Sequence, residues 1–186
     1  MSGIDWEAIF EDITTEAPAT DGDIEFLQQS VLAPLTEIEV AEVNASQRNP
    51  FRPGEPGYDE YKPNDPSCWA ISQRRFPPTF IEFLRWSNGG NFVNGEREFG
   101  MFDPKEIREY LLSYEIPEYM PGAVPFALDG GGGFFLFDMR NEPVDGEYPI
   151  VFSHSSSLGW DEEDHATLAK SFVEACTDPT DPNDEL

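Results

Sequence analysis

A run of four glycines after Asp129 is the first feature that could support chemistry, because glycine-rich turns can cradle phosphate groups. A phosphate loop also requires Gly-Lys-Ser/Thr after its glycines and a helix that follows them. Here Phe134–Phe137 follows Asp129–Gly133, and an apolar run of this kind is typical of a strand. The glycines therefore indicate a tight turn with at least one positive φ angle, and we expect no nucleotide or other cofactor.

The two histidines of the chain, His154 and His165, are candidates for acid–base catalysis. His154 lies among the serines of Ser153–Ser157, but a hydrolase needs a nucleophile, a base and an orienting acid in contact. The Gly-x-Ser-x-Gly pattern of a nucleophile elbow is absent. We expect no catalytic residue, and a hydrolase that uses His154 stays open as a remote alternative.

Clustered carboxylates could bind a metal ion or hydrolyse a glycoside. Asp161–Asp164 precede His165, but adjacent residues of a predicted helix point in different directions and could not share one ion. Asp129 and Asp138 could form a glycosidase pair, although such pairs carry little information in a chain with 37 acidic residues. We therefore predict a protein that is not an enzyme and has no metal site.

The chain is strongly acidic, with 37 acidic residues, 11 basic residues and a formal net charge of −26. This charge disfavours nucleic acid and anionic membrane as partners, because both present phosphate groups. It favours a basic protein partner, since opposite electric fields speed encounter. An acidic surface with little lysine also suits a high-salt habitat, and the charge alone does not separate the two causes.

The two cysteines, Cys68 and Cys176, form neither a disulfide framework nor a zinc site. The N-terminal residues lack the basic and apolar regions of a signal peptide, and no apolar run approaches the ~18 residues of a membrane span. These features predict a cytoplasmic protein.

The elements that would position these residues alternate irregularly. Apolar spacing and capping residues predict helices that begin at Asp5 and over Asp23–Leu32, Thr36–Ser46, Pro77–Asn88, Pro104–Tyr114 and Trp160–Cys176. Strands are expected over Cys68–Ile71, Asn91–Asn94, Glu96–Phe102, Val124–Leu128, Phe134–Met139 and Tyr148–Phe152. The order lacks a regular βαβ repeat, which indicates an α+β fold with a mostly antiparallel sheet and flanking helices. The predicted core contains Phe80, Phe83, Leu84, Phe135, Phe137, Ile150, Leu168 and Phe172.

Three regions follow from this pattern. Residues 1–33 form an N-terminal helical extension, and residues 34–176 form the main domain. The domain contains a proline-rich insertion at 49–67, whose aromatic residues favour packing on the body. Residues 177–186 form an acidic tail that we expect to be disordered.

Two of these segments resemble the SUKH superfamily, the Smi/Knr-like proteins. Phe76–Leu84 followed by Ser87–Gly90 is similar to the family signature Leu-Pro-x-x-Tyr-x-x-Phe-Leu…Asn-Gly-Gly, with phenylalanine in place of its leucine and tyrosine. Asp129–Gly133 with Phe137–Arg140 resembles the family's Asp-Gly-Gly-Gly turn and Phe-Asp strand. The resemblance spans about Leu32–Cys176, with the remaining helices and strands in the expected order.

The resemblance implies a SUKH-like α+β fold and a non-catalytic role in protein binding. Many bacterial members are immunity proteins that neutralise toxins, often nucleases, and fungal members regulate cell-wall synthesis through protein contacts. We therefore expect an immunity protein that binds a basic, nuclease-type toxin domain. The alternative is an intracellular regulatory or scaffold module without a toxin partner.

The acidic residues near the diagnostic strands are the predicted partner contacts, together with two tyrosines of the insertion that could serve as aromatic anchors. The predicted contacts are Asp129, Asp138, Glu142, Asp145, Glu147, Asp161, Glu162, Tyr58 and Tyr61.

Overall fold

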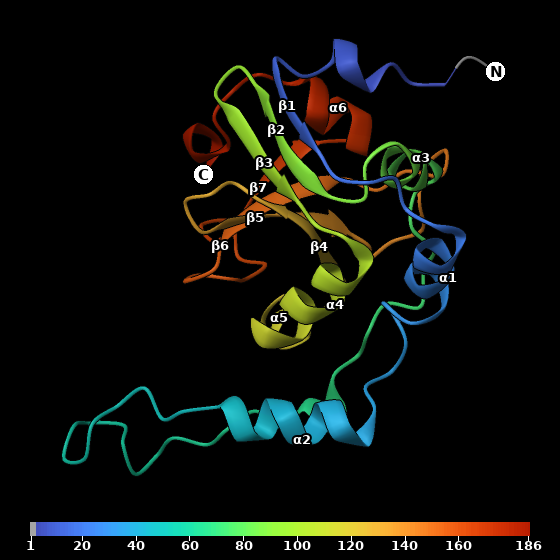
Figure 1. The fold of residues 1–186 in the computed structure, drawn as a ribbon. Helices are drawn as coiled ribbons and strands as arrows, with labels where there is room; N and C mark the ends of the chain where they lie inside the picture. Colours follow the sequence, from blue (N-terminus) through green and yellow to red (C-terminus); the bar gives the residue numbers. More distant parts are fainter. Residues whose placement is uncertain (1–2) are drawn as a thin grey trace.

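A single seven-stranded sheet organises the computed structural model, which describes residues 3–186 (Figure 1). The strands lie side by side in chain order, and each neighbouring pair is antiparallel. They are β1 (Asp12–Thr15), β2 (Gly90–Asn94), β3 (Arg97–Met101), β4 (Ala123–Leu128), β5 (Gly133–Asp138), β6 (Ile150–His154) and β7 (Ala166–Ala169). The predicted α+β fold with an antiparallel sheet is confirmed.

The described chain also contains six α-helices and three 3-10 helices. The α-helices are α1 (Asp21–Gln29), α2 (Glu37–Ser46), α3 (Pro78–Trp86), α4 (Pro104–Ser113), α5 (Ile116–Tyr119) and α6 (Phe172–Thr177). The 3-10 helices are η1 (Trp6–Ala8), η2 (Pro66–Cys68) and η3 (Pro182–Glu185). Helices α1 to α4 confirm the prediction within two or three residues, because each starts at a capping side chain or a proline.

Helices α3 and α6 cover one face of the sheet through an aromatic core. Phe80 and Phe83 of α3 and Phe172 of α6 are fully buried, and the ring centroid of Phe172 lies 5.1 Å from that of Phe80 and 5.5 Å from that of Phe83. Phe137 of β5 lies 5.2 Å from Phe80. The predicted core residues are buried except Leu168, which is half-buried against the same core.

Helix α4 covers the opposite face of the central strands. The ring centroid of Phe134, on β5, lies 5.9 Å from that of Tyr110 and 4.8 Å from that of Tyr114. Because both faces of β5 are covered, every residue of this strand is buried. The preceding turn has positive φ at Gly130 (78°) and Gly132 (99°), as the glycine run predicted.

The prediction of one long last helix from Trp160 to Cys176 is wrong. Ala166–Ala169 forms β7 on the edge of β6, and α6 begins only at Phe172. Ser171, two residues after the end of β7, caps α6, since its Oγ accepts a hydrogen bond from the Glu174 N–H at 3.2 Å. Pairing with β6 provides hydrogen-bond partners for backbone groups that would otherwise remain free at that edge. These hydrogen bonds between strands outweigh the local preference for a helix that the spacing of the apolar residues indicated.

The N-terminal residues belong to the sheet rather than to a helical extension. A single 3-10 turn, η1, replaces the predicted helix, and Ile13 lies in β1, which pairs with β2. Trp6 and Phe10 are buried in the main core, where the Trp6 ring centroid lies 5.3 Å from that of Phe83. The predicted strand at Cys68–Ile71 is also wrong, because η2 ends at Cys68 and irregular chain follows.

The C-terminal tail is packed and not disordered. Arg97, at the start of β3, is fully buried, and its side chain donates hydrogen bonds to the carbonyl oxygens of Thr180 (2.9 Å) and Ala175 (3.2 Å). The same guanidinium lies 3.3 Å from a carboxylate oxygen of Asp178. Asn94 adds a hydrogen bond of 2.9 Å to the carbonyl oxygen of Cys176, so the β2–β3 hairpin holds the tail.

The proline-rich insertion projects from the molecule as a long loop beyond α2 (Figure 1). Its base is fixed because Asn64 donates a hydrogen bond of 2.7 Å to Glu115 Oε2, beside α5, and Gln47 bonds the Asn64 carbonyl oxygen. Phe51 of this loop is 41% exposed. The expected packing of this segment on the body therefore holds only at its base.

Within residues 3–186, none of the helices combines the length and the apolar composition that a bilayer crossing requires.

An acidic groove as the candidate partner-binding face

One face of the β2–β3 hairpin has no helix over it. Side chains alternate along both strands, so Phe92 and Phe99 point into the aromatic core. Asn91 and Glu98 are exposed on the opposite face, where Gly100 is the direct cross-strand partner of Asn91. The uncovered face is therefore polar, and it is smooth at Gly100, where no side chain rises above the backbone.

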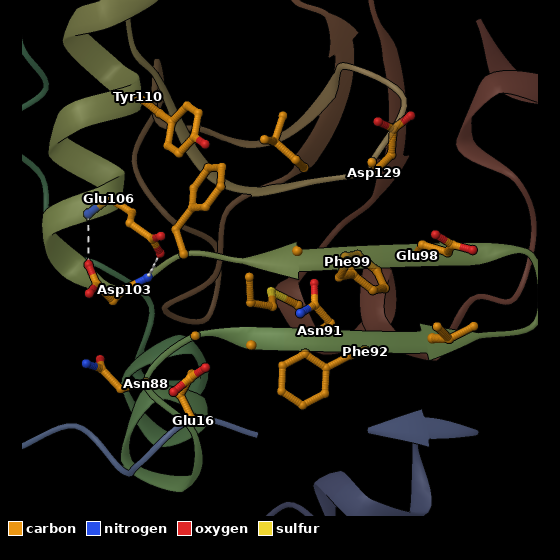
Figure 2. Close-up of a pocket in the computed structure, with 18 of the residues that line it drawn as sticks. Glu16, Asn88, Asn91, Phe92, Glu98, Phe99, Asp103, Glu106, Tyr110 and Asp129 are labelled. Atoms are coloured by element: carbon orange, nitrogen blue, oxygen red, sulfur yellow. Dashed lines mark hydrogen bonds between the residues drawn. The ribbon is translucent and has the colours of Figure 1, made fainter. Parts of the chain in front are cut away.

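The surrounding elements turn this face into a groove of about 630 Å³ (Figure 2). The segments at Glu16–Ala17 and Asn88–Gly90 form one wall, and the first turns of α4 with the Leu128–Gly130 turn form the other. We call this the acidic groove, because its lining includes five carboxylates and no lysine or arginine. The five carboxylates belong to Glu16, Glu98, Asp103, Glu106 and Asp129.

None of these five carboxylates forms an ion pair within residues 3–186. Figure 2 shows Asp103 and Glu106 toward one end of the groove and Glu98 with Asp129 toward the other. The groove therefore concentrates negative charge in a concave surface, which strengthens the local field above that of isolated surface charges.

Local structure fixes the orientation of three of the carboxylates. Asp103 is the N-cap of α4, where its Oδ1 accepts hydrogen bonds from the N–H groups of Lys105 (2.7 Å) and Glu106 (2.8 Å). Glu106 Oε2 accepts from the Asp103 N–H at 2.9 Å, which completes a capping box. Asp129 Oδ1 accepts from two N–H groups of its own glycine turn. The second oxygen of each of these carboxylates has no hydrogen-bond partner among the described residues.

An aromatic patch borders the groove beside α4. The Tyr110 ring is stacked on that of Phe102, with centroids 4.3 Å apart and planes 7° apart, and both residues line the groove. Burial raises the pKa of the Tyr110 phenol, and the nearby Glu106 carboxylate raises it further. The phenol therefore remains neutral around pH 7.

Several of the chain's cations are engaged in contacts elsewhere. Arg97 holds the C-terminal tail, and Arg108 forms two hydrogen bonds of 2.9 Å with Glu39. Arg74 pairs with Glu142. Lys105, the cation nearest in sequence to the groove carboxylates, lines a separate groove between α2 and α4. The acidic groove is thus left without a cation from its own chain among the described residues.

The structure places only Asp129 of the predicted contacts in the groove. Asp138 lies at the opposite end of β5 and is only 8% exposed. Burial raises its pKa, but hydrogen bonds from Arg140 outweigh this effect and leave the pKa below its ordinary value. The carboxylate of Asp138 therefore serves an internal ion pair, with 2.8 Å between its Oδ2 and Arg140 Nη2.

Two further predicted contacts have internal partners. Glu142 pairs with Arg74, and Glu147 accepts hydrogen bonds from the Thr79 hydroxyl (2.6 Å) and the Phe172 N–H (3.2 Å). These bonds explain why Glu147 is half-buried between α3 and α6.

The remaining predicted contacts lie apart from the groove. Asp145, Asp161 and Glu162 are exposed, and Tyr58 and Tyr61 are half-buried within the insertion, whose loop projects away from the sheet in Figure 1. The nine predicted residues therefore do not form one surface. The groove residues that sequence reasoning missed are Glu16, Asn88, Asn91, Glu98, Asp103, Glu106 and Tyr110.

The arrangement of the two histidines and of the clustered carboxylates gives little support for catalysis or metal binding. The His154 ring packs edge-on against Phe152, with centroids 5.5 Å apart, and the described residues give it no side-chain hydrogen bond. His165 packs against Trp160, and its Nδ1 lies 3.0 Å from the Asp161 carbonyl oxygen. No set of three His, Cys, Asp or Glu side chains within residues 3–186 is arranged to hold a metal ion.

The SMI1/KNR4 family (SUKH-1) model matches residues 70–175. The matched stretch runs from before α3 into α6 and contains every lining residue of the acidic groove except Glu16 and Ala17. No curated protein matches the chain.

Proposed function

Because the chain belongs to the SMI1/KNR4 (SUKH-1) family, we propose that it is a non-catalytic module that binds a basic protein partner through the acidic groove. The observation that carries this proposal is the set of five groove carboxylates without an ion-pair partner in the described chain. Like charges at close range repel one another, so a cation supplied by a partner would relieve that repulsion as well as add attraction.

The partner class that fits best is a nuclease-type toxin domain, which would make the protein an immunity protein. A nuclease binds the phosphate backbone in a basic cleft, and an acidic groove on an inhibitor complements such a cleft. The net charge of −26 supports fast encounter with a basic partner and disfavours competition by nucleic acid for the same groove.

Affinity capture from the native cells tests the proposal with three baits. They are the wild-type protein, a groove variant and a control variant that loses the same charge. The groove variant carries Glu16→Gln, Glu98→Gln and Glu106→Gln, and the control carries Glu7→Gln, Glu25→Gln and Glu109→Gln, all exposed and outside the groove. We expect wild type and control to capture the same basic protein and the groove variant to capture much less.

Equal capture by the groove variant and the control would place the binding surface elsewhere and overturn the proposal. The captured protein also decides between the two roles. Loss of its nuclease activity on addition of the wild-type protein supports immunity. A captured partner without toxic activity would keep the binding role of the groove and replace immunity with a regulatory or scaffold function.

A further inference from the structure

Strand β1 lies at one end of the sheet and has only β2 as a neighbouring strand (Figure 1). Building on the proposed function, we propose that the free edge of β1 receives an extended, basic segment of the partner, which pairs with it as an added strand. The added strand would extend the sheet face that carries the acidic groove.

The outer edge of β1 carries free hydrogen-bonding groups. In an antiparallel pair, alternate residues direct their N–H and C=O groups toward the neighbouring strand, and the residues between them direct theirs away from it. Because β1 pairs only with β2, this second set points out of the sheet. Within residues 3–186, the backbone of Asp12–Thr15 has no hydrogen bond outside the strand pairing, and the next such bond joins the Glu16 N–H to Ser87 Oγ at 2.9 Å.

The other end of the sheet is protected, whereas β1 is regular. The pairing of β7 with β6 contains a register shift between Ile150 and Val151, and the C-terminal η3 packs against β7. Bulges and covering segments are two means by which proteins block a sheet edge. In contrast, β1 keeps a continuous register with β2 over all four of its residues. The β1 edge is therefore the better template for a further strand.

The charge around β1 selects a basic occupant. Glu11, Asp12 and Glu16 are exposed on or beside the strand, and the first basic residue of the chain is Arg48. A second copy of the chain fits poorly, because two β1 strands paired antiparallel about their centres would place Glu11 of one copy opposite Glu16 of the other. The acidic residues thus oppose self-association and leave the edge open to a strand of opposite charge.

The cross-strand pairs place the added strand beside the groove. Thr14 lies opposite Asn91, and Asn91 lies opposite Gly100, so the three residues form one row across β1, β2 and β3. Asn91 and Gly100 line the groove, and so does Val93, the cross-strand partner of Asp12. Directly opposite side chains share one face of a sheet, so Asp12 and Thr14 belong to the groove face.

The two faces of β1 also predict the pattern of the partner segment. Ile13 pairs with the buried Phe92 and is itself half-buried against the core, so it belongs to the other face. Side chains of the added strand would alternate in the same way. We expect basic residues next to Asp12 and Thr14, and β-branched apolar residues next to Ile13.

A capped heptapeptide of alternating lysine and valine tests this inference with the full chain. Its control has the same sequence with a methyl group on every internal backbone nitrogen, which keeps the charge and the side chains but removes the N–H donors and blocks close pairing. Fluorescence anisotropy measures both affinities. We expect the unmodified peptide to bind about ten-fold more tightly, the scale of two backbone hydrogen bonds.

Amide hydrogen exchange of the wild-type protein locates the contact. The unmodified peptide should slow the exchange of the β1 amides that point out of the sheet and leave those of β7 unchanged. On the protein side, Asp12→Lys should weaken peptide binding about three-fold more than Asp161→Lys, which makes the same charge change at an exposed residue outside the groove.

Equal binding of the two peptides, including no measurable binding of either, would overturn the inference. Unchanged exchange in β1, slower exchange at β7 instead, or equal losses in the two lysine variants would also overturn it. If both peptides bind equally and both lose affinity for the groove variant relative to its charge-matched control, the proposed function stands and only the added strand is removed. Equal partner capture by the groove variant and its control removes the proposed function itself, so the two failures are distinguishable.

Discussion

Asp103 and Glu106 each perform two roles in the structure. Their capping bonds start α4, and their second oxygens contribute to the field of the acidic groove. A binding surface built from capping residues is stiff, because the backbone bonds that stabilise the helix also fix the side chains. Such preorganisation reduces the entropy lost when a partner binds.

The buried aromatic residues contribute stability instead. Phe83 is fully buried and contacts Trp6, Phe92 and Phe172 at centroid distances of 5.2 to 5.5 Å. Phe83→Ala should therefore lower the free energy of unfolding by about 3–5 kcal/mol, through lost burial and the cavity left behind. Urea denaturation measures this change, and Phe51→Ala in the projecting loop, where the side chain is exposed, provides the control, with an expected change within about 0.5 kcal/mol. A similar small change for Phe83→Ala would contradict the described core.

At this scale the sequence predicts burial better than it predicts contacts. Apolar spacing identified Phe80, Phe83 and Phe172 correctly, because core position follows from periodicity alone. It could not show that Asp138 and Glu147 are engaged inside the molecule, since their partners are fixed only by the final packing. The exposure of Glu98 was easier to predict from the sequence, because strand alternation places its side chain on the opposite face of the sheet from that of Phe99.

Helix α2 is held to the domain by one well-formed ion pair. Arg108 of α4 is largely buried, forms two hydrogen bonds with the Glu39 carboxylate and donates to the carbonyl oxygens of Val31 and Ala33. The hydrogen bonds from Arg108 lower the pKa of Glu39 to about 2, against an opposing effect of partial burial. The pair therefore couples the start of α2 to the body that carries the groove.

This coupling predicts a specific pH dependence. Because the pKa of Glu39 is depressed on folding, its stabilisation is present above the ordinary value of 4.5 and is lost as pH falls toward about 2. Glu39→Gln, which keeps an acceptor for the capping box, should lower the free energy of unfolding at pH 7 by about 1–2 kcal/mol after solvent screening. Urea titrations at several pH values measure the difference between wild type and variant. A difference that stays constant from pH 7 to pH 3 would contradict the pairing.

The tail and the β2–β3 hairpin form a second coupled unit. Arg97 is 0% exposed and bonds the Thr180 and Ala175 carbonyl oxygens, with Asp178 as its ion-pair partner. Arg97→Met should free residues 177–186, because these carbonyl oxygens and the carboxylate would lose their shared donor. Heteronuclear NOE values of those residues should fall toward those of a flexible chain, and Arg85→Met, at an exposed pair, serves as the control. Unchanged NOE values in the Arg97 variant would show that other contacts order the tail.

Element prediction failed where distant pairing decides the outcome. Ala166–Ala169 is short and carries helical spacing with its neighbours, so only the edge of β6 makes it a strand. The tail looked disordered because its composition is acidic and proline-rich, yet Arg97, far from it in sequence, orders it. Helices α3 and α4 were predictable because proline and capping residues start them locally.

Across the whole molecule, charge is distributed unevenly between the interior and the groove. Arg97 and Arg108 are buried and satisfy internal acceptors, whereas the five groove carboxylates lack ion-pair partners among residues 3–186. A habitat effect alone would call for acidity over the surface in general. Under the proposed function, partner binding depends more on the groove carboxylates than on carboxylates elsewhere on the surface. The groove and control variants lose equal charge, so a difference in their binding separates partner recognition from a habitat effect.

Association kinetics of the captured partner, measured across a salt series, test the central claim most directly. At low salt we expect the groove variant to associate about ten-fold more slowly than the charge-matched control, because rim and groove charges act mainly on the association rate. Near 1 M salt, where the Debye length falls to about 3 Å, the two rates should converge. Equal rates for the two variants at every salt concentration would contradict the claim that the acidic groove is the binding face.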